Sequence, residues 1–575
     1  MAHFHIKKKK GRPYLYVREI ARVAGKPKVI SQVYVGSPQK VAALARGEGD
    51  GDLKLKVEEF GALWLANQID SDVDLAGIVD DIVPGADRET GPSVGEYFLY
   101  AVLNRMVQAT SKNKLALWYK RTAIGQIRPV DVAELTSQRY WEKWDRVSEA
   151  DLELVAAEFF RRIIQLASPG ADCLLFDTTN YYTFMASGTP SKLARRGKNK
   201  EGRHNLRQVG LGLLVERGAR LPLYYRVYPG NLHDSRLFAQ VMDEMLGAVT
   251  TLGDTKERLT VVIDKGMNSE ANYAWVDDHR RLHFITTYST YFARELAGTP
   301  LERFEPIDTE KNRHLSETGR PEERLLAWRT RGEFWGKERA VVVTYNPKTA
   351  RKQAYTLDSK LDELRAELLL MRAKVREAAP HWRDPGMVRE RYLGHCQRLH
   401  LAAGLFTLEF TTAKGKLNMS FRADAHALKK KRAALGKNII ITDNTDWSTA
   451  EIVEASRERW QVEERFRQSK DEELVGAQPF RHWTDSKIRC HLFTCVAAMT
   501  YLRLLELRLA AAAGIERTAS DVMDDLRHLH SVLLLPGGAR KPRRRLETPT
   551  KTQAEVLRAF GHYVDKGGVL QPLSR

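Results

Sequence analysis

The stretch Ser456–Asp471, SRERWQVEERFRQSKD, is the segment from which the rest of the chain is interpreted. It contains neither Gly nor Pro and consists largely of good helix formers, so it predicts a helix. Four charged residues recur on one face of that helix: Arg459, Glu463, Arg467 and Lys470. This face fits a solvated helix with ion pairs between its turns. For an isolated stretch this is the better explanation, and the alternative, a metal-binding carboxylate beside cations that bind phosphate, requires two more acids elsewhere in the chain.

Two further carboxylates directly follow short apolar runs. Asp177 comes after Leu174-Leu175-Phe176, and Asp264 comes after the run LTVVI at 259–263. An Asp at the carboxyl end of a strand lies where open α/β sheets place their binding sites. The same residue is also common as a helix cap or in a turn. The pattern therefore allows a site with three carboxylates, Asp177, Asp264 and Glu463, but does not require one.

These segments together resemble the bacterial insertion-sequence DDE transposases, in the branch with the signature Y-(2)-R-(3)-E-(6)-K. Arg459, Glu463 and Lys470 match R, E and K, whereas Ser456 stands at the Tyr position. Three more segments are similar to the family: FDTTNYY at 176–182, PGNLHDS at 229–235 and IDKGMNSEAN at 263–272. The resemblance extends over residues 172 to 507, which is most of the chain.

The resemblance implies a DNA transposase that binds transposon ends, cleaves them by metal-dependent phosphodiester hydrolysis and joins the 3′-hydroxyl ends to target DNA. It implies Asp177, Asp264 and Glu463 as catalytic residues and as ligands of two Mg²⁺ ions, for which Mn²⁺ can substitute. Carboxylate oxygens suit these hard cations without help from His or Cys. Asp177 is expected to bridge both ions. The partners implied are double-stranded DNA, both terminal inverted repeats and target, and a second copy of the chain in a dimeric synaptic complex.

Two other functions stay open from the sequence. A ribonuclease-H-like nuclease would cut DNA without joining it, and a transposase relic would bind DNA with a dead site. Asp234, in PGNLHDS, competes with Asp264 as the second acid, but it follows a loop, which favours a place beside the ligands. Ser456 lacks the ring of Tyr, so the sequence does not decide whether cleavage passes through a DNA hairpin. Trp328, Trp335 and Trp460 could stack on a flipped base but are more typical of a core.

Charge points to a polyanionic partner. The net charge is +19 and the isoelectric point is about 9.6. Residues 191–207 contain seven cations against Glu201 alone: Lys192, Arg195, Arg196, Lys198, Lys200, Arg203 and Arg207. Such a run is often a solvated loop, but beside a proposed active site phosphate contact is the better explanation. The predicted DNA-binding residues are Arg459, Lys470, Arg467, Arg195, Arg196, Lys198, Arg203 and Arg207.

The sequence also sets an expected compartment. The N-terminus MAHFHIKKKK has no apolar core of a secretory signal. The most apolar long stretch, residues 492–514, contains Arg503, Glu506 and Arg508, which predicts a helix of a protein core and no membrane span. Four Cys without C-x-x-C spacing predict neither a disulfide scaffold nor a zinc site. We expect a bacterial cytoplasmic, nucleoid-associated protein.

The predicted fold is an α/β ribonuclease-H-like core, a mixed sheet flanked by helices, interrupted by an α+β insertion domain and preceded by a mostly helical DNA-binding region. The expected segments are a β-hairpin module (1–50), the helical region (51–165), the core in two parts (166–300 and 438–515), the insertion (301–437) and a basic C-terminal region (516–575). Core strands are expected near 209–215, 223–227, 284–286 and 438–442, with a helix near 235–246. The insertion should contain strands near 339–345 and 405–411 and helices near 361–375 and 388–401. The segment 540–545 is expected to be mobile.

Overall fold

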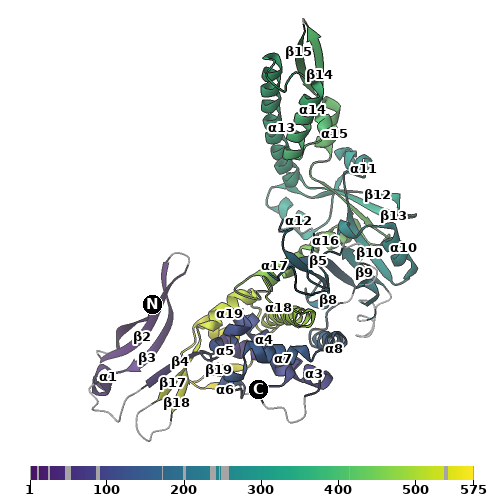
Figure 1. Cartoon of the computed structure of the whole chain (residues 1–575). Coiled ribbons are helices and arrows are strands. Elements are labelled where there is room, and N and C mark those ends of the chain that lie inside the picture. Colours follow the sequence, from purple (N-terminus) through teal and green to yellow (C-terminus); the bar gives the residue numbers. More distant parts are fainter. Residues whose placement is uncertain are drawn as a thin grey trace. The chain divides into compact units, whose positions relative to one another are not determined.

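The computed structural model describes residues 2–9, 12–23, 26–45, 54–85, 91–170, 172–197, 202–232, 238, 241–244, 247, 258–413, 415–535 and 542–573 (Figure 1). The chain forms two compact units. The first unit is Met1–Lys256 with Trp460–Arg575, and the second unit is Glu257–Arg459. The predicted linker at 47–51 and Asp234 lie outside the described residues. So does most of the helix expected near 235–246.

The N-terminus forms a small antiparallel sheet. Its strands are β1 (Ala2–Lys9), β2 (Arg12–Val23) and β3 (Lys26–Gly36), in that order, and α1 (Pro38–Ala45) follows. The predicted hairpin is therefore β2–β3. The lysine run Lys7–Lys9 adds a third strand, because it pairs with Pro13 and its neighbours at the start of β2.

A helical assembly around α18 (Asp485–Ala513) forms the core of the first unit. Its other helices are α2 (Gly61–Val73), α3 (Leu75–Ile82), α4 (Val94–Val107), α5 (Lys112–Tyr119), α6 (Ile124–Ile127), α7 (Ser137–Asp145) and α8 (Glu149–Ala167). Helices α2, α4, α7 and α8 pack directly on α18. Although α18 is long and apolar enough to cross a membrane, 78% of its apolar window is buried inside the protein, as predicted for a core helix.

The C-terminal region is folded onto this assembly. It comprises α19 (Ala519–Arg527), β17 (His530–Leu535), β18 (Arg543–Leu546), α20 (Lys551–Ala559), β19 (His562–Val564) and β20 (Leu570–Pro572). Strand β17 pairs with both β18 and β4 (Lys54–Glu59), which joins the two ends of the first unit in one sheet. The expectation of a mobile basic segment is wrong for Arg543–Arg545, because these arginines pair in β18.

Four antiparallel strands complete the first unit: β5 (Cys173–Thr183), β6 (Arg195–Arg196), β7 (Arg207–Glu216) and β8 (Pro222–Pro229). Strands β7 and β8 confirm the two strands expected here. The prediction that Asp177 ends its strand is wrong, since β5 continues to Thr183. The continuation TTNYYT is polar, but its Thr and Tyr residues favour β structure as strongly as aliphatic residues do.

The second unit contains a mixed sheet with the strand order β11-β12-β13-β16-β10-β9. The strands are β9 (Leu259–Ile263), β10 (Leu282–Tyr288), β11 (Glu305–Pro306), β12 (Leu326–Phe334), β13 (Lys337–Tyr345) and β16 (Lys437–Thr442). Strands β9 and β10 are parallel, whereas β16 is antiparallel to β10 and β13. Helices α10 (Glu270–Asp278) and α16 (Thr449–Glu458) pack on β10. A mixed sheet with helices fits the predicted ribonuclease-H-like core.

Shorter helices connect these strands. They are α11 (Arg294–Gly298) and α12 (Glu310–Glu317), and the 3₁₀ turns Lys265–Met267, Leu301–Arg303 and Pro321–Glu323. A further 3₁₀ turn, Val132–Glu134, lies in the first unit, and another, Ala403–Leu405, precedes β14.

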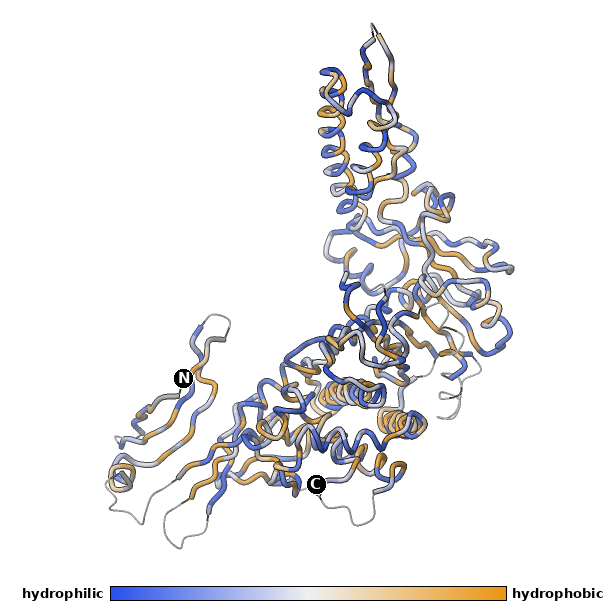
Figure 2. Tube along the Cα trace, viewed as in Figure 1, coloured by the Kyte–Doolittle hydropathy of each residue, from blue (hydrophilic) through white to orange (hydrophobic). Residues whose placement is uncertain are grey.

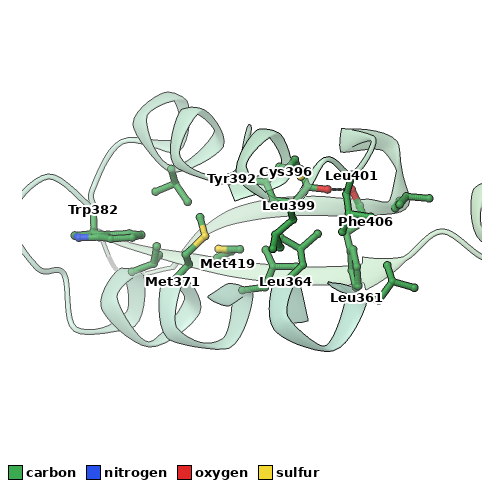
Figure 3. Close-up of a cluster of buried hydrophobic side chains, with 14 of the residues drawn as sticks. Leu361, Leu364, Met371, Trp382, Tyr392, Cys396, Leu399, Leu401, Phe406 and Met419 are labelled. Carbon is green, nitrogen blue, oxygen red and sulfur yellow. Dashed lines mark hydrogen bonds between the residues drawn. The ribbon is translucent and has the colours of Figure 1, made fainter. Parts of the chain in front are cut away.

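Residues 347–433 form a projection with its own core. It consists of α13 (Pro347–Arg376), α14 (Pro385–Leu399), the hairpin β14 (Phe406–Ala413) and β15 (Lys416–Ala423), and α15 (Ala425–Ala433). Hydrophilic and hydrophobic residues alternate along the turns of both long helices (Figure 2). Figure 3 shows side chains of α13, such as Leu364, directed toward Leu399 of α14 and toward Phe406. Strands β12 and β13, within the expected insertion 301–437, pair in the main sheet instead of this projection.

The stretch Ser456–Asp471 is not one uninterrupted helix. Helix α16 ends at Glu458, and α17 (Trp460–Lys470) begins after Arg459. Arg459 has φ −51° and ψ −23°, so the backbone stays right-handed through a local tightening. The boundary between the two units falls at the same point. Helix propensity could not reveal this break, because every residue in the stretch favours a helix or tolerates one.

Candidate functional site

Asp177 is a buried carboxylate in the middle of β5. Its side chain is 3% exposed, and its Oδ1 accepts a hydrogen bond from the Thr178 backbone N–H at 2.8 Å. Leu213 of β7 lies opposite it in the sheet. A buried carboxylate requires compensation by hydrogen bonds or cations, so this position is consistent with the predicted metal-binding role of Asp177, which stays a prediction.

Helix α17 packs against β5 and β7. The Tyr181 hydroxyl of β5 and the Ser469 hydroxyl of α17 are 2.6 Å apart, and the Lys470 Nζ lies 5.7 Å from the centre of the Tyr181 ring. Tyr181 shares its strand face with Asp177, since side chains alternate along a strand. Glu463 lies less than two turns before Ser469 on α17. The first unit therefore contains two of the three predicted ligands on elements that contact each other.

Glu463 and its neighbour Glu464 have different surroundings. The Glu464 carboxylate accepts a hydrogen bond from the Arg467 Nε at 2.8 Å, and the Arg467 side chain is 78% exposed. Glu463 is exposed on α17. Glu464 therefore forms an ion pair with Arg467, and this contact orients the Arg467 side chain.

Asp264 lies at the end of β9, as predicted. Its carboxylate caps a 3₁₀ turn through the Gly266 N–H at 3.3 Å and lies 3.3 Å from Nη1 of Arg459. Both side chains of this ion pair are partly exposed, 26% for Asp264 and 21% for Arg459. Two of the predicted site residues, Arg459 and Asp264, thus contact each other within the second unit. The positive charge of Arg459 offsets the negative charge of Asp264, which is predicted to bind metal.

The three predicted ligands belong to different units, Asp177 and Glu463 to the first and Asp264 to the second. Within the described ranges, no three His, Cys, Asp or Glu side chains form a group that could hold a metal ion. The residue types fit the predicted ions, because Mg²⁺ and Mn²⁺ are bound mainly by carboxylate oxygen and water. Metal binding by the three acids stays a prediction.

Two of the predicted DNA-binding arginines, Arg196 and Arg207, contact the loop after β5. Arg207 donates to the carbonyls of Ala186 (3.1 Å) and Thr189 (2.7 Å), and Arg196 donates to the Ser187 hydroxyl at 3.0 Å. The guanidinium of Arg203 lies 4.4 Å from the Tyr182 ring centre. Arg195 is exposed in β6, and Lys198 and Lys200 lie outside the described residues. These arginines shape the loop, and their contact with DNA stays a prediction.

Sequence reasoning missed a buried polar cluster beside α17. Arg105 of α4 is 4% exposed and donates to the carbonyls of Val475 and Gly476, and its Nη2 lies 3.3 Å from His491 Nδ1. His491 Nε2 lies 3.0 Å from the Ala477 carbonyl oxygen. Burial, together with the nearby Arg105, lowers the pKa of His491 well below its usual range, so the ring is neutral. The cluster fixes the segment that follows α17. The sequence did offer one indication of this cluster, because Arg105 stands within the largely apolar run AVLNRMV.

A family model described as the transposase DDE domain matches residues 172–501, more than half of the chain. No curated protein matches the sequence. Among solved structures, one similar chain comes from a cryo-EM structure of the piggyBac transposase synaptic complex with hairpin DNA. It has 9% identity, a TM-score of 0.38 and 82% coverage of each chain. From the match over 172–501, the chain belongs to the family of transposases with a DDE domain.

Proposed function

We propose that this protein binds the ends of a mobile DNA element, cleaves them by metal-dependent phosphodiester hydrolysis and joins the 3′-hydroxyl ends to target DNA. The observation that carries the proposal is the DDE transposase match over 172–501, which includes Asp177, Asp264 and Glu463. The spacing of Arg459, Glu463 and Lys470 supports membership in the bacterial insertion-sequence branch. The net charge of +19 supports a DNA partner.

The carboxylates of Asp177, Asp264 and Glu463 would together hold two Mg²⁺ ions. Bound divalent cations activate a hydroxyl nucleophile and stabilise the leaving oxygen of a phosphodiester. The Thr178 N–H orients the Asp177 carboxylate, and the hydrogen bond of Gly266 orients that of Asp264. Arg459 can hold Asp264 before DNA binds and then turn to a phosphate, since a partly exposed ion pair is weak. Lys470 would contact a second phosphate.

Synapsis of two transposon ends requires two active sites, so we propose that the working form is a homodimer on DNA. Cleavage and joining would take place in the bacterial cytoplasm on the nucleoid. The arginines Arg195, Arg196, Arg203 and Arg207 would add sequence-independent phosphate contacts, which position DNA without selecting its sequence.

Asn substitutions at the two aspartates test the proposal. A plasmid carrying the gene with its flanking genomic DNA serves as donor, and excised and joined products are measured with Mg²⁺ and with chelator. Asp177→Asn and Asp264→Asn should each abolish both products and leave DNA binding nearly unchanged, because an amide lacks the charge a divalent ion requires. If a variant retains more than a few per cent of the wild-type cleavage, the aspartate that was replaced is not a metal ligand.

Strand transfer is tested separately with pre-cleaved ends. Joined product is expected from the wild-type protein in Mg²⁺ or Mn²⁺. Cleavage without any joined product would instead indicate a ribonuclease-H-like nuclease. DNA binding with neither product would indicate a relic with a dead site.

A further inference from the structure

A hollow of about 640 Å³ lies in the first unit, lined by residues from α7, the end of β5 and the segment that joins α17 to α18. Pockets of roughly 300–1,000 Å³ are the usual size for small organic ligands. Four aromatic side chains line it: Trp141, Phe184, Phe480 and Trp483. Three of them are well exposed, Trp141 by 43%, Phe184 by 56% and Trp483 by 57%. Exposed aromatic residues gathered around one hollow mark a surface that binds a partner.

Two cationic side chains line the same hollow. Arg481 is exposed beside Trp483, and no carboxylate pairs with it among the described residues. Lys487 forms an ion pair with Asp145 at 2.8 Å, and its Nζ lies 5.9 Å from the Trp141 ring centre. A nucleotide presents a flat aromatic base joined to an anionic phosphate, so this pairing of aromatic and cationic groups is complementary to it.

One side chain that lines the hollow belongs to a buried histidine, whose ring packs against Trp144 and His491. His482 lines it, is 9% exposed, and its Nδ1 has no hydrogen-bond partner in the described structure. Burial, with the nearby Lys112 and Arg105, lowers the pKa of His482 far below its usual range, so the ring is neutral.

The hollow is connected to both the predicted acid strand and the basic loop. The Thr183 hydroxyl, at the end of β5, donates to the Phe480 carbonyl at 2.9 Å. Thr183 lies roughly 20 Å along β5 from Asp177, a length that about six base pairs of duplex cover. Asp485 accepts hydrogen bonds from the Ser191 hydroxyl and the Lys192 N–H, which holds the start of the basic segment at this rim.

We infer that this hollow binds an unpaired nucleobase of the DNA substrate, stacked on Trp483 and Phe184, with the adjoining phosphate on Arg481. The inference rests on the proposed function, since it assigns the base to DNA bound near Asp177. It adds a contact for single-stranded or unpaired DNA that neither the three acids nor the basic loop provides. Base stacking tolerates any sequence, because every base has an aromatic face.

The test compares two ligands that differ only in their bases. Binding of the full-length protein to a twelve-nucleotide oligothymidylate and to an abasic oligomer of about equal length is measured by fluorescence anisotropy, in chelator so that no cleavage occurs. The wild-type protein should bind the thymidylate roughly five- to 100-fold more tightly than the abasic oligomer. Trp483→Ala and Phe184→Ala should remove most of this difference and leave affinity for the abasic oligomer unchanged. Arg481→Ala should weaken binding of both oligomers.

Tyr563→Ala is the matched control, because Tyr563 is an exposed aromatic residue (41%) of β19, outside the hollow. It should keep the full preference, and thermal unfolding of all variants checks their folding. Equal wild-type binding of both oligomers, or a preference that survives in Trp483→Ala and Phe184→Ala, would overturn the inference alone. Failure to bind either oligomer or duplex DNA would overturn the DNA-binding function as well.

Discussion

At the scale of single residues, Glu463 and Glu464 are the most informative pair in the chain. They lie about 100° apart around α17, so they face different surroundings. Glu464 is engaged by Arg467, whereas Glu463 lies on the helix whose Ser469 contacts Tyr181 of the Asp177 strand. Only Glu463 fits the spacing from Arg459 and Lys470.

Glu463→Gln should therefore abolish DNA cleavage, and Glu464→Gln should keep most of it. The first change removes a carboxylate proposed to bind metal, whereas the second removes an exposed ion pair worth less than about 1 kcal/mol. Excision from the donor plasmid in Mg²⁺ measures both, each variant serving as the control for the other. The reverse result would mean that Glu464 is the metal ligand. The spacing that assigns phosphate contacts to Arg459 and Lys470 would then no longer hold.

The predicted site residues differ in how well the sequence alone could place them. Asp264 is where its apolar run indicated, after β9, because such a run ends where the chain turns. Asp177 is inside its strand, because Thr and Tyr continue β5 without apolar side chains. The Arg459–Asp264 ion pair and the Arg105 cluster are contacts between distant segments, which periodicity cannot detect.

At the scale of elements, α4 holds the segment that leaves α17. Arg105 donates to two carbonyls of that segment from a buried position. We expect Arg105→Leu to lower the free energy of unfolding by about 2–5 kcal/mol, since buried carbonyls without donors are costly. Urea unfolding measures the loss, and hydrogen exchange should become faster across residues 471–484.

Arg139→Leu is the control for this change, because Arg139 of α7 is 52% exposed and its ion pairs lie at the surface. It should alter stability by less than about 1 kcal/mol. If Arg105→Leu behaves like Arg139→Leu, α4 does not position the segment after α17.

The sheet that joins β4, β17 and β18 contains a pH-dependent contact. Burial alone would lower the pKa of His530, but its hydrogen bond to Glu547 (3.0 Å) and the charge of that carboxylate raise the pKa above its usual value. The folded state therefore binds this proton more tightly than the unfolded state. The stabilisation is fully present below pH about 6.5 and is lost as the pH rises through the elevated pKa.

His530→Gln should consequently destabilise the protein by about 1–2 kcal/mol at pH 6, and by progressively less as the pH rises above 6.5. Thermal unfolding of wild type and variant across this range gives the difference. His314→Gln, in the exposed part of α12, should show no such trend. A difference that grows with pH would mean that His530 is neutral in the folded protein.

Elements with a clear apolar period were predictable, and irregular ones were not. Runs or stripes of largely apolar residues mark the strands β7, β8, β9 and β10 and the helices α13 and α14. The break between α16 and α17 depends on one residue's dihedral angles, and β18 on pairing with β17, so neither has a local sequence signal. Strand β13 joins the main sheet by pairing with β16, and β12 joins it by pairing with β13, which only the folded chain reveals.

At the scale of the whole molecule, a net charge of +19 should make DNA binding strongly dependent on salt. Arg459→Ala and Lys470→Ala should each reduce the slope of log K against log salt by roughly one, as expected for the loss of one phosphate contact. Fluorescence titrations at several salt concentrations measure the slope. Arg313→Ala, on α12 and paired with Asp308, is the control. Unchanged slopes would mean that neither residue contacts a DNA phosphate. The role of Arg459 would then lie in its ion pair with Asp264, and that of Lys470 in its contact with Tyr181.

Helix α18 has a consequence for the synthesis of the chain. Its partners α2, α4 and α8 are complete by Ala167, but α18 begins only at Asp485, roughly 300 residues later. At about 5–20 residues per second, the ribosome needs on the order of 15–60 seconds to cover that distance. During this interval the apolar faces of the early helices have no permanent cover. We therefore expect the nascent protein to bind chaperones that recognise exposed apolar surface, and a fragment truncated before α18 to aggregate.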